Sequence, residues 1–382
     1  MKIGIITVQK SRNFGANLQA YALQKKLELM GYDAEIIDYL YYKHPDFNYT
    51  AKARPVWKIG FKRVVVEFVK YRILNRILYK LIPFFSIDQR KQNETFEHFY
   101  KKYMKLSKTY YSIDELYKAT MDYDTYIVGS DQVWNPNTGS NISPYFLTFA
   151  PNNAKKVAYA SSFGVSSVDE SLKSLYIKWL NNLDAISVRE STGVSLVKEL
   201  VHREATHVLD PTLLMTRDEW DGLTTDINII PGYVLIYETY RSQKIIDIAR
   251  KYAKQNNVPI YRIELRAILN HKDDGIVNLN GCGPIEFVSL IKNAGLVLTS
   301  SFHGTAFSVI YNKKFVVVLN EKKSNNSRIE SLLELLKLKQ LIEYEGENTN
   351  NKEYGLYDEI QVNDILELQR KMSINYLKSA LD

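Results

Sequence analysis

The chain has 382 residues, of which 45% are hydrophobic and 24% charged, a balance typical of a soluble globular protein with a packed core. This composition excludes a disordered, collagenous or fibrous chain, and the length leaves room for two or three domains. Cys282 is the single cysteine, so an intramolecular disulfide framework is impossible and a thiolate zinc cluster is not expected. The first residues read as a buried strand rather than a signal peptide, and no uncharged apolar run reaches the ~18 residues that a membrane span needs. These features predict a cytoplasmic protein.

The positive charge is concentrated in one segment. The whole chain carries a net charge of +7, and residues 52–108 hold 15 lysines and arginines against 4 acidic residues. The rest of the chain is therefore slightly acidic. The binding partner of this basic segment is therefore considered separately from that of the rest of the chain.

Strands and helices alternate from the start of the chain. Residues 3–8 form a continuous apolar run, as expected for a parallel strand covered on both faces, and apolar residues recur at helical spacing over 18–30. A second strand at 34–37 completes a strand–helix–strand unit. The basic segment interrupts this pattern with two predicted helices, at about 64–81 and 88–102. The pattern then resumes with strands at 125–128, 157–160 and 185–188 and a helix at 170–183.

The alternation restarts after Pro231 and Gly232. The later predicted elements are strands at 233–237, 258–263, 296–299 and 315–319 and helices at 242–255, 284–293, 303–311 and 363–381. The sequence therefore predicts an α/β fold of two doubly wound, Rossmann-like domains facing a cleft. The first domain covers residues 1–225, with a basic helical insert at about 43–120. The second covers residues 226–382, and its terminal helix is expected to pack back across both.

In open parallel sheets, ligands bind beyond the carboxyl ends of the strands, so the loops there are the candidate sites. The first such loop carries Asn13, Gly15 and Asn17 between a strand and its helix. Glycine permits close approach of a ligand, and the helix N-terminus favours an anion. A ligand contact and a simple capped turn are equally compatible with this loop.

The loop after the strand at 125–128 carries a carboxylate, two amides and an indole: Asp131, Gln132, Trp134 and Asn135. Sugars are held by such sets, with hydroxyls bonded to the polar groups and an apolar face laid on the aromatic ring. The alternative is that Trp134 belongs to an interdomain core and Asp131 caps a helix. We favour the binding function.

Arg189 follows the strand at 185–188 directly. An arginine at this position can hold a carboxylate or phosphate bidentately, which lysine cannot imitate. The alternative is a surface ion pair with Glu190, which would be worth little.

The loop at 299–305 brings hydroxyls and an imidazole to a strand-to-helix junction. Ser300, Ser301 and His303 lie here, and among the six histidines only His303 has such a setting. A histidine near its ordinary pKa is a natural general acid or base. The alternative is a histidine at the start of a helix whose ring is hydrogen-bonded to the backbone.

Arg328, in the polar loop after the next strand, is a reserve candidate for a phosphate contact. No spacing in the sequence supports a metal site, a nucleophile elbow or a Walker loop.

These motifs occur together in an order that resembles the polysaccharide pyruvyl transferases. The resemblance spans residues 1 to about 340, outside the basic insert. It is carried by residues 13–19, the GSDQVW motif at 129–134, AYASSFG at 158–164, SVRE at 187–190, DPT at 210–212 and SFHG at 301–304.

The resemblance implies a glycosyltransferase-B-like fold and transfer of pyruvate from phosphoenolpyruvate onto two hydroxyls of a sugar, as a cyclic ketal. It implies a donor contact for Arg189 and a donor-binding or acid role for His303. We expect the hydroxyls of Ser161, Ser162, Ser300 and Ser301 to contact the donor as well. Family members often carry an arginine two residues before the histidine, where this chain has Ser301. If that arginine holds the donor, Arg328 or a lysine of the 321–324 loop must replace it, or the donor differs.

The chemistry of this reaction fits the candidate residues. Phosphoenolpyruvate carries a carboxylate and a phosphate, which require cations and N–H donors. His303 could protonate the vinyl carbon, and Asp131 could accept the proton of the attacking hydroxyl. The scheme requires no metal ion or other cofactor.

Two other functions share the same two-domain cleft: a nucleotide-sugar-dependent glycosyltransferase and a non-catalytic carbohydrate-binding protein. The acceptor in the favoured function is a lipid-linked or nucleotide-linked sugar. Residues 52–108, with their aromatic residues, would suit an anionic membrane surface and peripheral attachment to the inner face of the cell membrane. A helical subdomain with merely solvated charges is the alternative, and no motif supports nucleic-acid binding.

Overall fold

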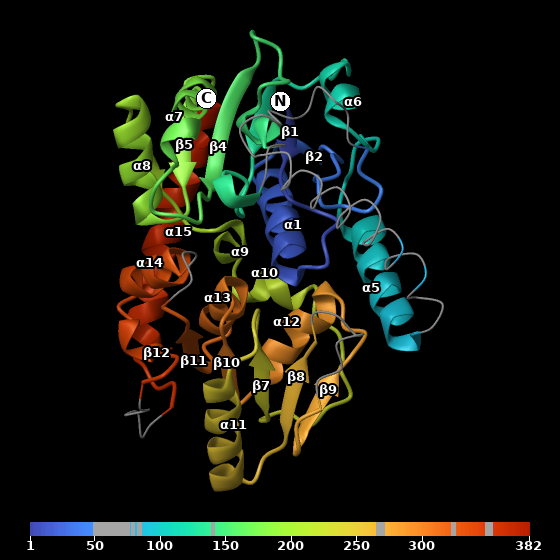
Figure 1. Cartoon of the computed structure of the whole chain (residues 1–382), viewed down its shortest axis with the longest axis vertical. Helices are drawn as coiled ribbons and strands as arrows, with labels where there is room; N and C mark the ends of the chain where they lie inside the picture. The colour runs from blue at the N-terminus through green and yellow to red at the C-terminus, as the bar shows by residue number, and fades with distance from the viewer. Residues whose placement is uncertain are drawn as a thin grey trace.

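The computed structural model describes residues 1–48, 86–138, 142–264, 272–321, 326–347 and 354–382, together with Ile77 and Leu81. Two parallel six-stranded sheets form its two halves, one above the other in Figure 1. The predicted α/β class with two doubly wound units is confirmed by these sheets.

The first sheet has the order β2-β1-β3-β4-β5-β6. Its strands are β1 (Lys2–Ile6), β2 (Asp33–Ile36), β3 (Thr125–Val128), β4 (Lys155–Ser161), β5 (Ala185–Val188) and β6 (Thr206–His207). Most strand residues are buried, as a parallel sheet covered on both faces requires. The helices of this half are α1 (Phe14–Leu29), α6 (Ile113–Tyr117), α7 (Glu170–Leu180) and α8 (Ser191–Val201), with short 3₁₀ turns η3 (Pro136–Thr138) and η4 (Ser143–Phe146). The helix α5 (Ile87–Tyr103) extends from this half along the second one, where it contacts α12.

The second sheet has the order β12-β11-β10-β7-β8-β9. Its strands are β7 (Val234–Tyr237), β8 (Ile260–Ile263), β9 (Ile276–Leu279), β10 (Leu296–Thr299), β11 (Lys314–Leu319) and β12 (Ile342–Tyr344). The associated helices are α11 (Gln243–Asn256), α12 (Pro284–Asn293), α13 (Phe302–Ile310), α14 (Ser327–Leu335) and the 3₁₀ turn η6 (Lys339–Leu341). The chain winds outward from β7 in one direction and from β10 in the other, which is the dinucleotide-fold strand order.

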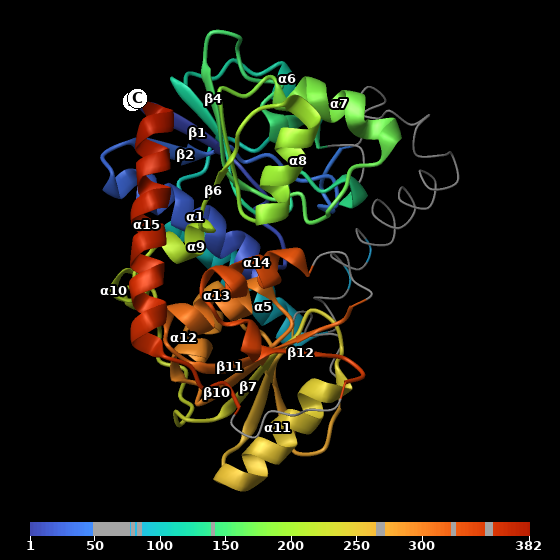
Figure 2. The same ribbon diagram turned by 90° about the vertical axis from the view of Figure 1, so that its left-hand side faces the viewer.

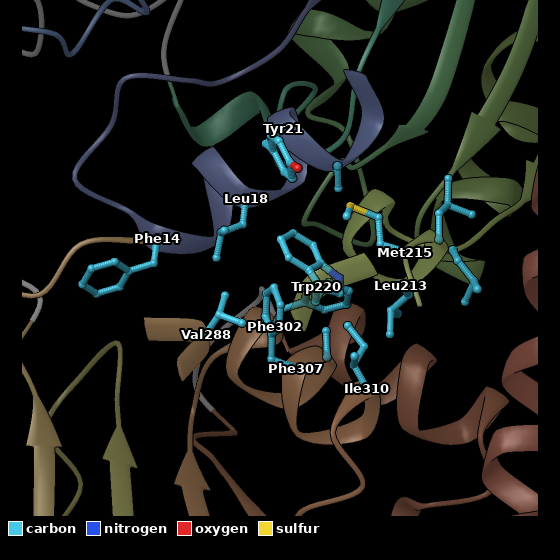
Figure 3. Close-up of a cluster of buried hydrophobic side chains, with 14 of the residues drawn as sticks. Phe14, Leu18, Tyr21, Leu213, Met215, Trp220, Val288, Phe302, Phe307 and Ile310 are labelled. Carbon is cyan, nitrogen blue, oxygen red and sulfur yellow. The ribbon is translucent and has the colours of Figure 1, made fainter. Parts of the chain in front are cut away.

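Short helices α9 (Pro211–Leu214) and α10 (Arg217–Asp221) connect the halves, and their apolar side chains join α1 to α13. Trp220 lies at the centre of this core, with its ring 5.9 Å from that of Tyr21 and 4.9 Å from that of Phe307 (Figure 3). Residues of both halves therefore share one hydrophobic core.

The terminal helix α15 (Glu359–Leu381) runs along both halves (Figure 2). Arg370 donates to the carbonyl oxygens of Leu213 and Met215, at 2.7 and 3.1 Å. Tyr376 donates to the Ala158 carbonyl on β4 at 2.9 Å. The helix thus fixes the first sheet to the connecting segment.

Much of the predicted basic insert lies outside the described residues, including the expected helix at 64–81 apart from Ile77 and Leu81. The second expected helix is α5, and its Phe96 and Phe99 are buried in the shared core, where the ring of Phe96 stacks 5.4 Å from that of Phe14. The apolar face of α5 therefore serves protein packing. Within the described ranges, no helix combines the length and apolar character needed to cross a membrane.

Candidate functional site

The strand order reverses between β1 and β3 in the first sheet and between β7 and β10 in the second. Ligands of doubly wound sheets bind at such switch points. Residues that follow β3, β7 and β10 line one cavity of about 420 Å³, so the two switch points open into the same space. Residues that line this cavity include Asn13, Tyr41, Tyr42, Lys43, Asp131, Gln132, Ile142, Tyr145, Thr239, Tyr240, Ser300, Ser301, Phe302, His303, Asn326 and Arg328.

Asp131 sits at the end of β3 with a left-handed backbone (φ 72°), a conformation that costs energy for a residue with a side chain. Its Oδ1 lies 3.6 Å from Arg189 Nη2 and 4.0 Å from Arg328 Nη1. The carboxylate is nearly buried between two arginines, one from each half of the molecule. It can accept a proton or a hydrogen bond from a ligand in the cavity.

Asp210 links the polar groups beneath the cavity. Its fully buried carboxylate accepts hydrogen bonds from Ser130 Oγ and Arg189 Nη1, each at 2.8 Å, and from the hydroxyl of Thr212 at 2.6 Å. Burial alone would raise the pKa of Asp210, but nearby His303 and Arg189 outweigh it and hold the pKa well below the usual value. Asp210 is therefore a fixed negative charge.

Arg189 is enclosed rather than exposed. Its side chain is 1% exposed, and its guanidinium lies 4.4 Å from the ring centre of Phe302, the first residue of α13. Burial acts to lower its pKa, but Asp210, Asp131 and Glu190 reverse the direction and raise it. Arg189 Nε and Nη2 make no hydrogen bond within the part of the chain that the structure describes.

His303 occupies the first turn of α13, after Ser301, whose hydroxyl caps the helix by accepting from Gly304 N. Its Nε2 lies 3.8 Å from Asp210 Oδ2 and is buried with no hydrogen-bond partner among the described residues. The ring also lies against Gly15, where an added Cβ would come within 1.9 Å of His303 Nδ1. The imidazole is held by contacts from both halves, with one nitrogen left for another partner.

Arg328, in the first turn of α14, supplies a cation to the opposite side of the cavity. Burial and the charge of Arg189 lower its pKa to about 10, which still leaves it charged at neutral pH. With the Gln132 amide turned so that its oxygen faces the guanidinium, that oxygen accepts from Arg328 Nη2 at 3.0 Å.

The structure gathers some predicted site residues and separates others. Those that line the cavity are Asn13, Asp131, Gln132, Ser300, Ser301, His303 and Arg328. Gly15, Asn17, Ser161, Ser162 and Arg189 lie behind its wall. Asn17 ties its loop to the carbonyl of Ser11 at 2.7 Å, and Ser162 donates to Glu190 at 3.0 Å.

Trp134 is not available as a sugar platform in this structure. Its indole is fully buried, stacked 5.1 Å from Phe146, and donates to the carbonyl of Tyr145 at 2.8 Å. The alternative of a core tryptophan describes it better, although the core belongs to the first half rather than to the interface between the halves. Asn135 lies behind the wall, where its Oδ1 accepts a hydrogen bond from Asn137 N at 2.9 Å.

Several important residues were missed from the sequence. The sequence did hold a signal for Asp210, because an aspartate that follows a strand and directly precedes a proline is typical of a helix N-cap. Thr239 and Tyr240 follow β7, the switch-point strand of the second sheet. Because ligands bind beyond the carboxyl ends of strands, these two residues could have been predicted as site residues. Tyr145 carried no such signal.

Within the described residues, no group of three or more histidine, cysteine, aspartate or glutamate side chains is arranged to hold a metal ion. The site as described consists of two arginines, two aspartates and a histidine around one cavity.

Comparison with solved structures found distant similarities. An α-glucosyltransferase in complex with UDP and DNA covers 98% of this chain and 90% of its own, at 12% identity and a TM-score of 0.45. A UDP-GlcNAc 2-epimerase from Methanocaldococcus jannaschii covers 97% and 93%, at 12% identity and a TM-score of 0.48. A UDP-N-acetylglucosamine 2-epimerase from Rickettsia bellii covers 99% and 96%, at 11% identity and a TM-score of 0.43.

A comparison with curated proteins gave no match. A comparison with protein families matched residues 13–322 to the polysaccharide pyruvyl transferases. This match begins just before α1, takes in β2 to β11, and includes all the charged residues of the cavity except Arg328. The chain belongs to the polysaccharide pyruvyl transferase family.

Proposed function

We propose that this protein transfers the pyruvyl group of phosphoenolpyruvate onto two hydroxyls of a sugar in a polysaccharide precursor, forming a pyruvate ketal. The observation that supports this most directly is the cavity between the two switch points, which joins a buried arginine, a carboxylate and a histidine whose Nε2 has no hydrogen-bond partner in the described part of the chain. The reaction needs a cation for the anionic groups of the donor, an acid that protonates its methylene carbon and a base that accepts the proton of the attacking hydroxyl.

The donor side of the cavity is the second half. The first turns of α13 and α14 both border it through Ser301, Phe302, Asn326 and Arg328. Free N–H groups and the helix dipole favour an anion at such ends, and Arg328 adds a full charge. We assign the phosphate and carboxylate of phosphoenolpyruvate to this side. Arg328 would thus replace the arginine that family members often carry where this chain has Ser301.

His303 would protonate the methylene carbon, which makes C2 of the donor electrophilic. The fixed negative charge of Asp210, 3.8 Å from Nε2, would stabilise the imidazolium that must form first. Arg189 would act behind the wall by holding Asp131 and Asp210 in place, rather than by touching the donor.

Asp131 would accept the proton of the first attacking hydroxyl. Its two arginine neighbours hold it in position within the cavity. Addition of that hydroxyl to C2, departure of phosphate and attack by the second hydroxyl would complete the ketal. The atoms balance as phosphoenolpyruvate plus a diol giving a ketal plus inorganic phosphate.

The acceptor would be carried on a lipid or a nucleotide. A lipid carrier would give the basic segment at 52–108 a role at an anionic membrane surface, with the protein attached peripherally. Co-sedimentation with anionic and neutral liposomes at low and high salt tests this part. Equal and negligible binding to both would leave a nucleotide-linked acceptor.

The central experiment measures phosphate release from phosphoenolpyruvate with a panel of lipid-linked and nucleotide-linked sugars. The methyl group of the ketal, followed by NMR, identifies the product. Release of a nucleoside diphosphate from a nucleotide sugar, without consumption of phosphoenolpyruvate, would contradict the proposal.

A further inference from the structure

Tyr145 has an unusual position in the cavity wall. It lies in η4, is 3% exposed, and packs edge-on against Tyr39 with the ring centres 6.0 Å apart. Its carbonyl oxygen accepts the hydrogen bond from the Trp134 indole, so backbone and ring are both fixed. The ring nevertheless lines the same cavity as Asp131 and His303.

The hydroxyl of Tyr145 is buried and has no hydrogen-bond partner among the residues that the structure describes. Two other buried tyrosines of the first half have a partner: Tyr176 donates to the Trp134 carbonyl at 2.8 Å and Tyr159 to the Leu209 carbonyl at 3.0 Å. An unpaired buried hydroxyl destabilises the folded protein, whereas phenylalanine would fill the same space without that cost. The position therefore suggests a partner that enters the cavity.

The chemistry of the surrounding wall indicates which partner. Burial and the nearby Asp131 carboxylate raise the pKa of Tyr145, so the phenol remains a neutral donor at physiological pH. Asp131 is an acceptor on the same side of the cavity, and both residues come from the first half. Tyr41, Tyr42 and Ile142 of that half add apolar surface beside them. A sugar presents this combination: hydroxyls that donate and accept, and an apolar ring face.

We propose that Tyr145 and Asp131 together bind the acceptor diol, with the Tyr145 hydroxyl donating to one of the two sugar oxygens that enter the ketal and Asp131 accepting from the other. This inference rests on the proposed function and assigns the acceptor subsite to the first half of the molecule. It also explains how sugar can bind although Trp134 is buried.

The test is Tyr145→Phe, which keeps the ring and removes one oxygen. Binding of methyl glycosides of galactose, glucose and mannose is followed by ligand-observed NMR, and binding of phosphoenolpyruvate by calorimetry. We expect Tyr145→Phe to weaken glycoside binding about tenfold or more and to leave phosphoenolpyruvate binding within about twofold. Its unfolding midpoint should be equal to or above that of the wild type.

Tyr357→Phe is the matched control, because the Tyr357 hydroxyl is also buried without a partner in the described part of the chain but lies against Phe315, away from the cavity. It should bind glycosides as the wild type does. Equal glycoside binding by wild type and Tyr145→Phe would overturn the inference, as would failure of every methyl glycoside to bind the wild type. Glycoside binding that depends on Tyr145 in a protein that does not bind phosphoenolpyruvate would support the sugar subsite and contradict the proposed donor.

Discussion

Gly15 and His303 are in direct contact across the two halves of the molecule, so closely that a Cβ on residue 15 would lie 1.9 Å from His303 Nδ1. Gly15 belongs to the first turn of α1, and His303 to the first turn of α13. We expected the space beside Gly15 to admit a ligand, but the imidazole of His303 fills it. The position of His303 thus depends on a missing side chain in the opposite half.

Gly15→Ala should therefore destabilise the protein, although alanine normally favours a helix over glycine. Forcing a methyl group against the imidazole is expected to cost about 1–3 kcal/mol of unfolding free energy. The same substitution in a His303→Ala background should cost much less, because the clashing ring is gone. Urea unfolding of the four proteins measures this coupling.

The control for this cycle is Gly222→Ala, whose added Cβ meets only the Glu219 carbonyl oxygen at 3.6 Å. Additive effects of Gly15→Ala and His303→Ala would show that the two residues do not interact as described.

His303→Gln should abolish transfer while the protein remains folded. Glutamine keeps polarity at the helix start but cannot shuttle a proton, and loss of a general acid costs about 100- to 10,000-fold in rate. Phosphate release per enzyme, with circular dichroism to verify folding, is the measurement. His98→Gln on the exposed face of α5 serves as the control. Turnover within a few-fold of wild type would remove His303 from the chemistry.

Asp210→Asn should make the free energy of unfolding depend less steeply on pH in the acid range. Burial raises the pKa of Asp210, but His303 and Arg189 reverse this and hold it below the ordinary value of about 3.9. A carboxyl with a lowered folded-state pKa contributes stability above its unfolded pKa, and this contribution is lost as pH falls towards the folded value. The wild type should therefore lose stability between about pH 5 and pH 2 more steeply than Asp210→Asn.

At pH 7 the same variant should be less stable by about 3–5 kcal/mol, because Arg189 loses its closest buried partner. Urea unfolding at a series of pH values gives both results, with the exposed Asp122→Asn as control. Parallel pH profiles for wild type and Asp210→Asn would contradict the assigned role of this carboxylate.

Much of the fold was predictable because parallel strands buried on both faces are continuous apolar runs. The strand predicted at 296–299 is β10 itself, and the helix predicted at 284–293 is α12. The site followed from one rule, that chemistry lies beyond the carboxyl ends of strands, and this placed Asp131 and His303 in the same cavity.

The failures concern features that depend on distant parts of the chain. Nothing local to Trp134 shows that Phe146 and Phe163 enclose its ring. The contact between Gly15 and His303 and the hydrogen bonds of Asp210 likewise arise only when separate segments meet. A sequence gives the candidates for a site, whereas their burial is decided by packing.

Arg189→Lys should reduce activity although the charge is kept. Lysine cannot pair with Asp210 while also extending a flat cation under the Phe302 ring. We expect kcat/KM for phosphoenolpyruvate to fall at least about tenfold, together with a loss of stability that reflects the buried ion pair. Steady-state kinetics with varied phosphoenolpyruvate and urea unfolding test both effects, and an unchanged kcat/KM would show that Arg189 has no part in donor use.

Arg328→Gln should separate binding from stability. The pKa of Arg328 is lowered to about 10 because burial and the nearby Arg189 both disfavour its charge, so the folded protein holds this cation at an energetic cost. Removing the charge should leave the unfolding midpoint unchanged or raised, while a structural arginine would give a lower midpoint. Binding of phosphoenolpyruvate, measured by calorimetry, should weaken at least about tenfold because a charge-assisted contact is lost.

The control is Lys339→Gln, which removes an exposed cation paired with Glu334 outside the cavity and should bind phosphoenolpyruvate as the wild type does. Binding by Arg328→Gln within twofold of wild type would mean that the donor's anionic groups are held elsewhere.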